Sequence, residues 1–403
     1  MRRRTTTAAT LLALTCLAPA APATATTGEH DPAPVVVATG LDNPRQLGWD
    51  RDGASLLVAE AGSGGDTCAG EGPQRQCAGL TGAVGLVHDP GARTGGAPHR
   101  VVTGLASIAA PDGSFAVGSD GAAATELPGI YAAAMTYVPP EAFPGVDLPG
   151  GFARQLGSVV LGGHGYSYPV VDLAAAEARL NPDGAQVESN PYGILVVPRT
   201  ATTPTHALVA DAAANTVWRV GIGGDLRPRV SVFATYPTPP DDDTTPEFVP
   251  TSLARDADGN VYVGGLGSEQ PGAAQVVKYS AGGRELHRWT GFTGVTGVAV
   301  AGDGTLYVSQ LFGAGAPGGG EDGEPVAPND DVPGPGPGAP GDVVRVAPSG
   351  ERTSVPVPFP AGLAVDEEGA VYVSAWSVSD ADGAPAGPAG PATPGGQIWR
   401  LGS

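Results

Sequence analysis

Two acidic side chains close strand-like segments of the sequence, in places where carboxylates can bind a cation. Glu60 ends "SLLVAE" and Asp211 ends "HALVAD". If these segments occupy equivalent places in a repeated fold, both carboxylates would face a common mouth. Oxygen ligands from several segments suit Ca²⁺ or another divalent cation. The alternative is that each carboxylate accepts hydrogen bonds from neighbouring backbone amides.

Further polar residues begin strand-like segments and are expected at the same mouth, as candidate ligand-binding residues: Asn43, Arg45, Asn190, Tyr192 and Thr251. The places equivalent to Glu60 in three other repeats hold Gly265, Gln310 and Ala375, which add no carboxylate. Two carboxylates with amides predict at most a weak site for a cation or a polar ligand.

No established catalytic motif accompanies these residues. The sequence has no HExxH, no CxxC and no Gly-x-Ser-x-Gly, and its six histidines are scattered. Gly336, Gly338 and Gly341 match GxGxxG, but they lie in a Pro-rich segment without the strand and helix that a dinucleotide site needs. The sequence therefore identifies no catalytic residue, and it favours a protein that is not an enzyme.

The elements that position these residues form a repeat. The segments "ARDADGNVYVGG" (254–265), "VAVAGDGTLYV" (298–308) and "LAVDEEGAVYV" (363–373) each read as two strands around an Asp/Gly turn. We find six such hairpins, one expanded at 194–211 and one degraded at 115–135. A third strand follows every hairpin, and a fourth follows five of them.

The strand that the sixth unit lacks is available at the other end of the chain, as "PVVVATG" (34–40). Six four-stranded units with a borrowed strand predict an all-β fold, a six-bladed β-propeller with antiparallel blades. We expect one propeller domain over 34–403. A pair of β-sandwiches explains neither the repeat nor the borrowed strand.

Long insertions fall mostly between the second and third strands, so they gather on one face, which in repeat proteins is often the binding face. The Gly/Pro-rich insertions at 313–341 and 380–396 are interpreted as solvated loops without a binding role. The insertion at 61–79 is the better binding candidate, because Cys68 and Cys77 are expected to form a disulfide there. The excursion at 173–193 starts with a helix-like segment.

The composition and the net charge restrict the kinds of partner that the protein is expected to bind. Residues 1–25 read as a signal peptide, so a secreted, extracellular protein is expected. The net charge of −20 argues against nucleic acids and anionic membranes, and the apolar run in 1–25 is too short for a membrane span. The expected partner is a small molecule or an extracellular protein, and we expect a monomer.

The chain resembles the ScyD/ScyE family of secreted bacterial proteins, which is named after members of a scytonemin pigment gene cluster. The resemblance rests on "GLDNPRQL" (40–47), "VADAAANTVWRV" (209–220), "VPTSLARDADGNVYVGGL" (249–266) and the motif "NPDG…ESNPYGIL" within 181–195. It implies a six-bladed propeller of the NHL or TolB kind and no established activity. Where this chain has Gly265 and Gln310, members of the family tend to carry Glu.

Three functions follow as hypotheses. The first is a secreted module that binds a ligand or a protein at the mouth. The second is a metal-assisted lactonase or lyase with Glu60 and Asp211 as ligands. The third, which depends on the family name alone, is a role in handling extracellular pigments or secondary metabolites.

Overall fold

The computed structural model describes residues 33–402, except 93, 140–141, 202, 223–226, 240–244, 313–340, 381 and 384–394. The predicted signal peptide, nearly all of the 313–341 insertion and most of the 380–396 insertion lie outside these residues. Among the described residues, no helix is long and apolar enough to cross a membrane.

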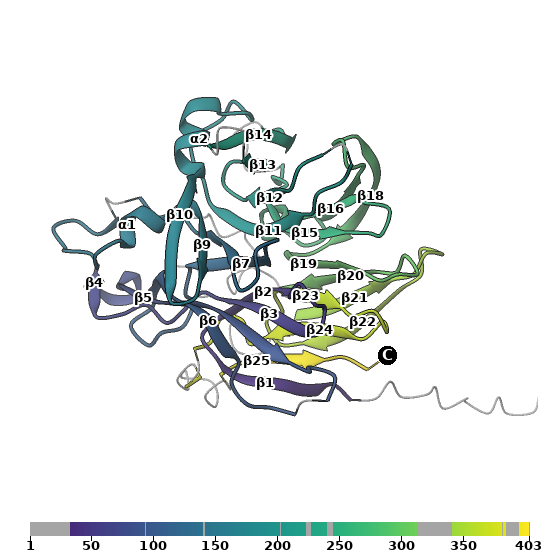
Figure 1. Ribbon diagram of the computed structural model, residues 1–403, viewed down its shortest axis with the longest axis horizontal. Helices are drawn as coiled ribbons and strands as arrows, with labels where there is room; N and C mark the ends of the chain where they lie inside the picture. Colours follow the sequence, from purple (N-terminus) through teal and green to yellow (C-terminus); the bar gives the residue numbers. More distant parts are fainter. Residues whose placement is uncertain are drawn as a thin grey trace, which may run out of the picture.

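The first three blades are antiparallel sheets that follow one another along the chain (Figure 1). Their strands, from the inside outward, are β2 (Pro44–Trp49), β3 (Ser55–Glu60), β5 (Gln76–His88) and β6 (His99–Ala109) in blade 1; β7 (Ser119–Ala124), β8 (Tyr131–Met135), β9 (Ser158–Gly163) and β10 (Tyr166–Asp172) in blade 2; and β11 (Pro191–Val197), β12 (His206–Asp211), β13 (Thr216–Ile222) and β14 (Pro228–Thr235) in blade 3.

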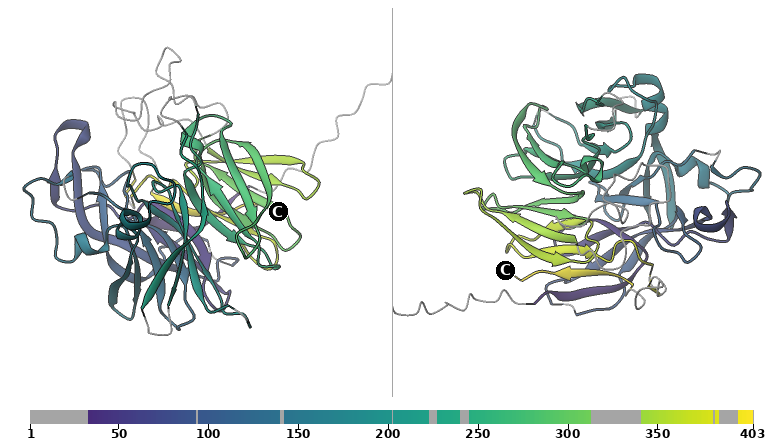
Figure 2. Two further views of the ribbon diagram at one scale, coloured as in Figure 1. Left: turned by 90° about the horizontal axis from the view of Figure 1, so that it is seen from above. Right: turned by 180° about the vertical axis from the view of Figure 1, so that it is seen from behind.

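The other three blades complete the ring, as Figure 2 shows from behind. Their strands are β15 (Pro250–Arg255), β16 (Val261–Gly265), β17 (Ala274–Tyr279) and β18 (Glu285–Phe292) in blade 4; β19 (Val295–Val300), β20 (Leu306–Gln310), β21 (Gly341–Val346) and β22 (Arg352–Val357) in blade 5; and β23 (Leu363–Val365), β24 (Val371–Ala375), β25 (Gly396–Arg400) and β1 (Val35–Leu41) in blade 6. The six-bladed, four-stranded prediction is confirmed.

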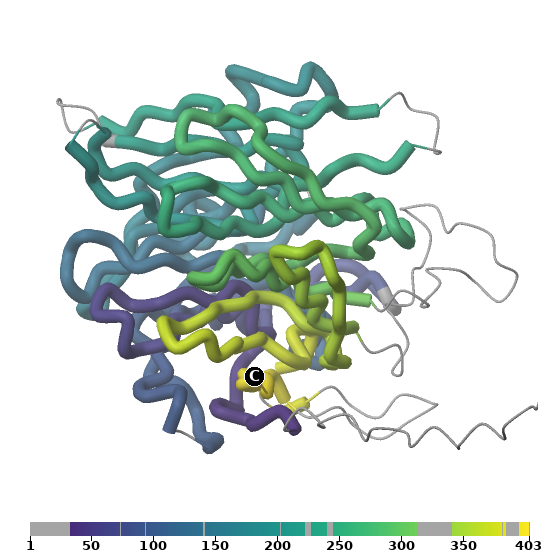
Figure 3. Tube along the Cα trace, turned by 90° about the vertical axis from the view of Figure 1, so that its right-hand side faces the viewer, coloured from purple at the N-terminus to yellow at the C-terminus, as the bar shows by residue number. Residues whose placement is uncertain are grey.

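The N-terminal strand closes the ring. β1 pairs antiparallel with β25, so the two ends of the described chain share one sheet. Val37 and Leu41 of β1 are fully buried. In Figure 3 the purple β1 lies close to the yellow C-terminal segment. The borrowed strand predicted from "PVVVATG" is therefore consistent with the structure.

The Asp/Gly turns are structural, because their side chains bond to their own turn. In blade 4 the Asp256 carboxylate accepts the Asn260 N–H at 2.8 Å, and Gly259 has a φ of 84°. A residue with a side chain is strained at that φ, which is why glycine stands there. We call the end of the propeller that carries these turns the turn face, and the opposite end the loop face.

The core lies between neighbouring blades. One buried cluster, for example, joins Tyr262 and Val276 of blade 4 to Val298, Leu306 and Val308 of blade 5. Each blade is therefore apolar on both faces, and its innermost strand borders the central channel.

Short helical segments on the loop-face connections include η1 (Gly72–Gln74), α1 (Phe152–Gln155) and η3 (Gly267–Glu269). Another segment, α2 (Leu173–Leu180), begins the excursion after β10, as the sequence predicted. The Asp172 carboxylate caps α2 by accepting the Ala175 N–H at 2.7 Å.

The predicted disulfide is confirmed, since Cys68 and Cys77 are bonded. They stand directly opposite each other where β4 (Thr67–Ala69) pairs with β5. The segment 61–79 is thus partly a hairpin rather than a simple loop, and its last residues belong to β5.

Candidate functional site

The register of the inner hairpins defines an equivalent position in the blades. In five blades the first residue of the inner strand pairs with the last residue of the second strand, as Pro44 pairs with Glu60 and Pro191 with Asp211. The residue that follows is the second of its inner strand. We call these five residues the inner ring: Arg45, Asp120, Tyr192, Thr251 and Thr296.

Two members of the inner ring join their blade to the next one. The Thr251 hydroxyl donates to the carbonyl oxygen of Val295 at 2.7 Å, and the Thr296 hydroxyl donates to that of Pro360 at 2.9 Å. Both threonines are buried. These side chains hold neighbouring blades together, so the prediction that Thr251 binds a ligand has a structural alternative.

Arg45 is the inner-ring residue of blade 1, and its guanidinium group contacts three protein groups. Its guanidinium donates to the carbonyl oxygens of Ser377 and Ala116, in blade 6 and in the segment before blade 2. Its Nε lies 3.4 Å from Oδ1 of Asp120. Arg45 therefore ties both ends of the ring together and neutralises a buried carboxylate.

Asp120 is the inner-ring member with the most unusual environment. The residue is 2% exposed, and its Oδ1 makes no hydrogen bond within the described structure. Burial raises the pKa of Asp120 to about 7, although Arg45 opposes that rise. A carboxyl group with such a pKa exchanges protons near neutral pH.

Sequence reasoning missed Asp120, because the hairpin of blade 2 is degraded and its register is hard to read. Its position in the strand could have identified it. Asp120 is the second residue of the strand "SDGAAA" (119–124), just as Arg45 and Tyr192 are the second residues of their inner strands.

Tyr192 is the neighbouring inner-ring member in blade 3. Burial is the main cause that raises its pKa to about 12; Asp120 adds to this effect and Arg45 opposes it. No hydrogen bond of its hydroxyl is found among the described residues. The structure thus brings Arg45, Asp120 and Tyr192 into one electrostatic group.

The two predicted asparagines bond to protein groups. Asn43 is buried and donates to the carbonyl oxygens of Gly62 and Gly113, both at 2.8 Å. The Asn190 side chain accepts the Thr136 hydroxyl at 2.6 Å. Both residues fix loops at the loop face, and neither lines a cavity described below.

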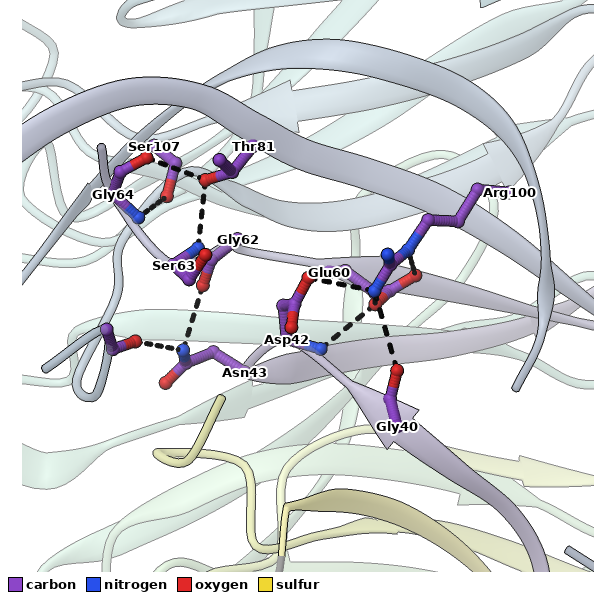
Figure 4. Close-up of polar contacts among 11 residues, drawn as sticks. Gly40, Asp42, Asn43, Glu60, Gly62, Ser63, Gly64, Thr81, Arg100 and Ser107 are labelled. Carbon is purple, nitrogen blue, oxygen red and sulfur yellow. Dashed lines mark hydrogen bonds and ion pairs between the residues drawn. The ribbon is translucent and has the colours of Figure 1, made fainter. Parts of the chain in front are cut away.

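Glu60 is held in an ion pair (Figure 4). Arg100 donates to both of its oxygens, Nε to Oε1 at 2.9 Å and Nη2 to Oε2 at 2.6 Å, and the Asp42 N–H donates to Oε2 at 3.0 Å. The Glu60 side chain is fully buried, whereas that of Arg100 is 37% exposed. Every oxygen of Glu60 therefore has a donor from its own blade.

Asp211 is likewise fully buried and saturated with donors. One oxygen accepts from the Ser189 hydroxyl at 2.7 Å and the Trp218 indole at 3.0 Å, and the other accepts from the backbone N–H groups of Asn190 and Ala214. Gln310, in the equivalent place of blade 5, accepts the Thr293 N–H at 2.6 Å. The ends of these second strands thus anchor the segment that enters the inner strand.

These hydrogen bonds decide whether Glu60 and Asp211 can bind the cation predicted from the sequence. Glu60 and Asp211 belong to different blades and offer no oxygen without a donor, so they do not fit a shared divalent ion. In the part of the chain that the structure describes, no group of three or more His, Cys, Asp or Glu side chains could hold a metal ion.

The central channel contains a cavity. A cavity of about 250 Å³ is lined by all six inner strands and reaches their turn-face ends at Trp49, Ala124, Arg255, Val300 and Val365. Its walls expose polar and apolar surface in about equal amounts. Sequence reasoning expected ligands on the loop face, whereas this cavity lies in the half of the channel nearer the turn face.

A narrow neck continues the cavity toward the middle of the channel. The neck has a volume of about 10 Å³ and shares Gln46, Leu47 and Leu253 with the cavity. Its other lining residues include Tyr192, Thr251 and Ser252. The Ser252 hydroxyl is buried and has no hydrogen-bond partner within the described structure. A mixed wall therefore leads to a neck in which one buried hydroxyl has no partner.

Comparisons with known proteins give remote structural likenesses. No family model matches the chain, and no curated protein matches it. The resemblance to the ScyD/ScyE family therefore stays a prediction.

Several solved structures are similar in outline. A luciferin-regenerating enzyme is 10% identical, with 92% of this chain and 96% of that chain covered and a TM-score of 0.41. Regucalcin from Agrobacterium tumefaciens, described as a calcium-binding protein, is 12% identical, with 92% and 93% covered and a TM-score of 0.45. The PQQ-bound aldose sugar dehydrogenase from Streptomyces coelicolor is 12% identical, with 91% and 96% covered and a TM-score of 0.44. These values are too low to carry an argument about function.

Proposed function

We propose that this propeller is a binding module for a small molecule that has an apolar body and one polar group. The molecule would occupy the central channel, with its body in the cavity and its polar group at the neck. In line with the signal peptide predicted at 1–25, this binding would take place outside the cell.

The cavity is the observation that carries this proposal. Its volume of about 250 Å³ exceeds the roughly 150 Å³ of an apolar cavity that accepts benzene. Burying apolar surface contributes about 25 cal/mol per Å² to the free energy of binding. A molecule of one or two rings would bury apolar surface against side chains such as Leu195, Leu253 and Val298.

The neck supplies the selectivity. A buried hydroxyl without a partner costs about 1–3 kcal/mol, which a ligand recovers by bonding to it. Ser252 offers such a hydroxyl, and Tyr192 lines the same neck. A ligand with a hydroxyl or carbonyl group at one end should bind more tightly than a purely apolar analogue.

Filling the cavity tests the proposal. Gly48 lines the cavity, and a Cβ built there meets only the carbonyl oxygen of Ala122, at 3.7 Å. Gly48→Leu should therefore fold and occupy the space that the ligand needs. With 1-naphthol as the probe, titration by fluorescence should show binding to the wild type and a large loss of affinity in Gly48→Leu.

The matched control is Gly302→Leu, because a Cβ at Gly302 has open space around it and the residue does not line the cavity. Equal binding of 1-naphthol by Gly48→Leu and the wild type would overturn the proposal.

A second candidate is an enzyme of the lactonase or lyase kind, and Asp120 is the observation that favours it. Its pKa of about 7 suits a general acid or base, and Arg45 and Tyr192 stand in the same group. In this version Asp120 would move the proton, and the metal ligands Glu60 and Asp211 of the sequence hypothesis would not be needed.

A lactone-hydrolysis assay separates the two candidates. The enzyme candidate requires activity on alkyl γ-lactones that follows the ionisation of Asp120 and is lost in Asp120→Asn. If the wild type binds 1-naphthol but hydrolyses no lactone, the binding module stands and the enzyme candidate falls.

A further inference from the structure

Glu177 is a buried carboxylate without a partner, and the proposed channel site does not use it. It lies on α2, in the excursion between blades 2 and 3 on the loop face. The residue has no exposed surface, and neither of its side-chain oxygens makes a hydrogen bond within the described structure. An uncompensated buried carboxylate is costly unless a proton or a cation accompanies it.

A second buried oxygen without a hydrogen-bond partner lies at the end of the same helix. Asn181 follows one helical turn later and caps α2, with its N–H donating to the carbonyl oxygen of Glu177 at 2.8 Å. Asn181 has left-handed backbone angles, so the helix ends there and the chain turns toward residue 185. The Asn181 amide nitrogen donates to the carbonyl oxygen of Ala185 at 3.0 Å, but its buried Oδ1 has no hydrogen-bond donor among the described residues.

Asp183 adds negative charge to the same corner. Its Oδ1 accepts the Ala185 N–H at 3.1 Å, and its Oδ2 accepts the Thr238 hydroxyl at 2.9 Å. Each oxygen keeps a lone pair for another contact. The turn from 181 to 185 is therefore held in place by its own hydrogen bonds and by blade 3.

The charges around Glu177 are all negative. Asp183 and Asp211 both raise the pKa of Glu177, in addition to its burial, and no positive group opposes them. Asp211 already has four donors, so it contributes charge rather than a ligand. Three buried oxygens therefore lack donors in one short segment, and the charges acting on Glu177 are negative.

We propose that Glu177 and Asn181 bind a Ca²⁺ ion, with Asp183 next to them. Calcium takes oxygen ligands only, accepts a bidentate carboxylate and an amide carbonyl, and tolerates irregular geometry. Water and backbone carbonyl groups complete its coordination, because no three carboxylates converge here. The ion would fasten α2 and the 181–185 turn to blade 3.

The competing explanation is that Glu177 holds a proton. The two differ in their response to calcium at about pH 8, where an added proton is disfavoured and the carboxylate is free to bind the ion. The experiment is isothermal titration of the full chain with CaCl₂ at that pH, together with thermal unfolding with and without the salt.

We expect Ca²⁺ to bind and to raise the melting temperature of the wild type. Glu177→Gln should lose one equivalent of bound ion, or bind it more weakly on the order of a hundredfold. Asn181→Gly provides a second variant, because glycine keeps the left-handed conformation of Asn181 while removing the amide oxygen. It should weaken binding in the same way.

The matched control is Glu188→Gln, which removes an exposed carboxylate from the same excursion. It should bind Ca²⁺ as the wild type does. The proposal is overturned if the wild type shows no calcium-dependent shift, or if Glu177→Gln and Asn181→Gly both retain it. It does not depend on the channel, so 1-naphthol should bind equally with and without Ca²⁺.

Discussion

At the scale of single residues, one position of the repeat serves different purposes in different blades. Thr251 and Thr296 bond to the next blade, and Arg45 bonds to both neighbouring blades. Asp120 and Tyr192 are left with unsatisfied polar groups in the same ring. Asp120 pairs with Arg45 across blades 1 and 2, whereas Tyr192 lines the neck.

Gln46 gives the most direct test of how the inner strands are joined. Its amide donates to the carbonyl oxygen of Ile194 at 2.7 Å and accepts the Ile194 N–H at 2.9 Å, so it bridges blades 1 and 3. Gly121 of blade 2 lies beneath it: a Cβ there would lie 2.4 Å from the Tyr192 carbonyl oxygen and 2.6 Å from the Gln46 amide oxygen.

We predict that Gln46→Ala lowers the free energy of unfolding by about 1–3 kcal/mol, because it leaves the carbonyl oxygen and the N–H of Ile194 without their side-chain partner. Gly121→Ala should cost about 2 kcal/mol, because the backbone carbonyl cannot move aside. Urea denaturation measures both, with Gly302→Ala as the control in open space. A fully neutral Gly121→Ala would show that the inner strands pack more loosely than described.

Asp120 should make stability depend on pH. Its carboxyl ionises at 3.8 when unfolded and at about 7 when folded, so the folded state holds more protons between these values. The contribution of Asp120 to stability should therefore be largest below about pH 4 and should fall as the pH rises to about 7, by on the order of 4 kcal/mol. Glu177, whose pKa is also raised to about 7, adds to the same slope.

Asp120→Asn should flatten that slope, measured as the free energy of urea unfolding across the window. Glu367→Gln, an exposed carboxyl on the turn face, should leave the slope unchanged. The environment assigned to Asp120 is refuted if the slope persists in Asp120→Asn.

The sequence located candidate residues better than it assigned their roles. Glu60 and Asp211 were predicted at the ends of second strands, and they stand there. Their partners were not predictable, because Arg100 is 40 residues from Glu60 and the pairing depends on blade geometry. The alternative stated from the sequence, that backbone amides bind these carboxylates, agrees with their observed hydrogen bonds.

At the scale of elements, the repeat was strong enough to predict all six blades. Alternating apolar residues and Asp/Gly turns specify each hairpin locally, so little tertiary information was needed. The cavity near the turn face was not predictable. It arises from how six inner strands meet, and small residues such as Ala123 and Ala254 line it without any sequence motif.

The hairpin of β4 and β5 gives an element-scale prediction. Its pairing places Cys68 opposite Cys77, and few other strands support β4. Replacing both cysteines with serine should lower stability by about 2–3 kcal/mol in the chain-entropy model. Amide exchange should show the loss concentrated in β4, and 1-naphthol binding should persist. If binding disappears, the 61–79 segment takes part in the site.

At the scale of the whole molecule, closure of the ring depends on contacts between distant parts of the chain. β1 completes blade 6, and the Arg45 backbone carbonyl accepts the Ser374 hydroxyl of blade 6 at 2.7 Å. The borrowed strand was predictable because its sequence resembles the fourth strands. The Arg45 contacts were not, since they bridge more than 300 residues.

We predict that a chain starting at residue 42 loses cooperative unfolding and aggregates. It would expose the edge of β25 and remove the buried side chains of Val37 and Leu41. Each of those side chains contributes about 1.5–3 kcal/mol. A chain starting at residue 33 is the control. Size-exclusion chromatography and urea unfolding compare the two, and equal behaviour would contradict closure by β1.

The central claim is that the channel binds a small molecule, and locating a bound probe tests it most directly. Crystals soaked with a bromonaphthol allow the bromine to be found by anomalous diffraction. We predict a bromine peak between the inner strands, in the cavity lined by Ala123, Leu195 and Ala254, and no such peak in Gly48→Leu. A peak only on the loop face, or an equal peak in Gly48→Leu, would contradict the account.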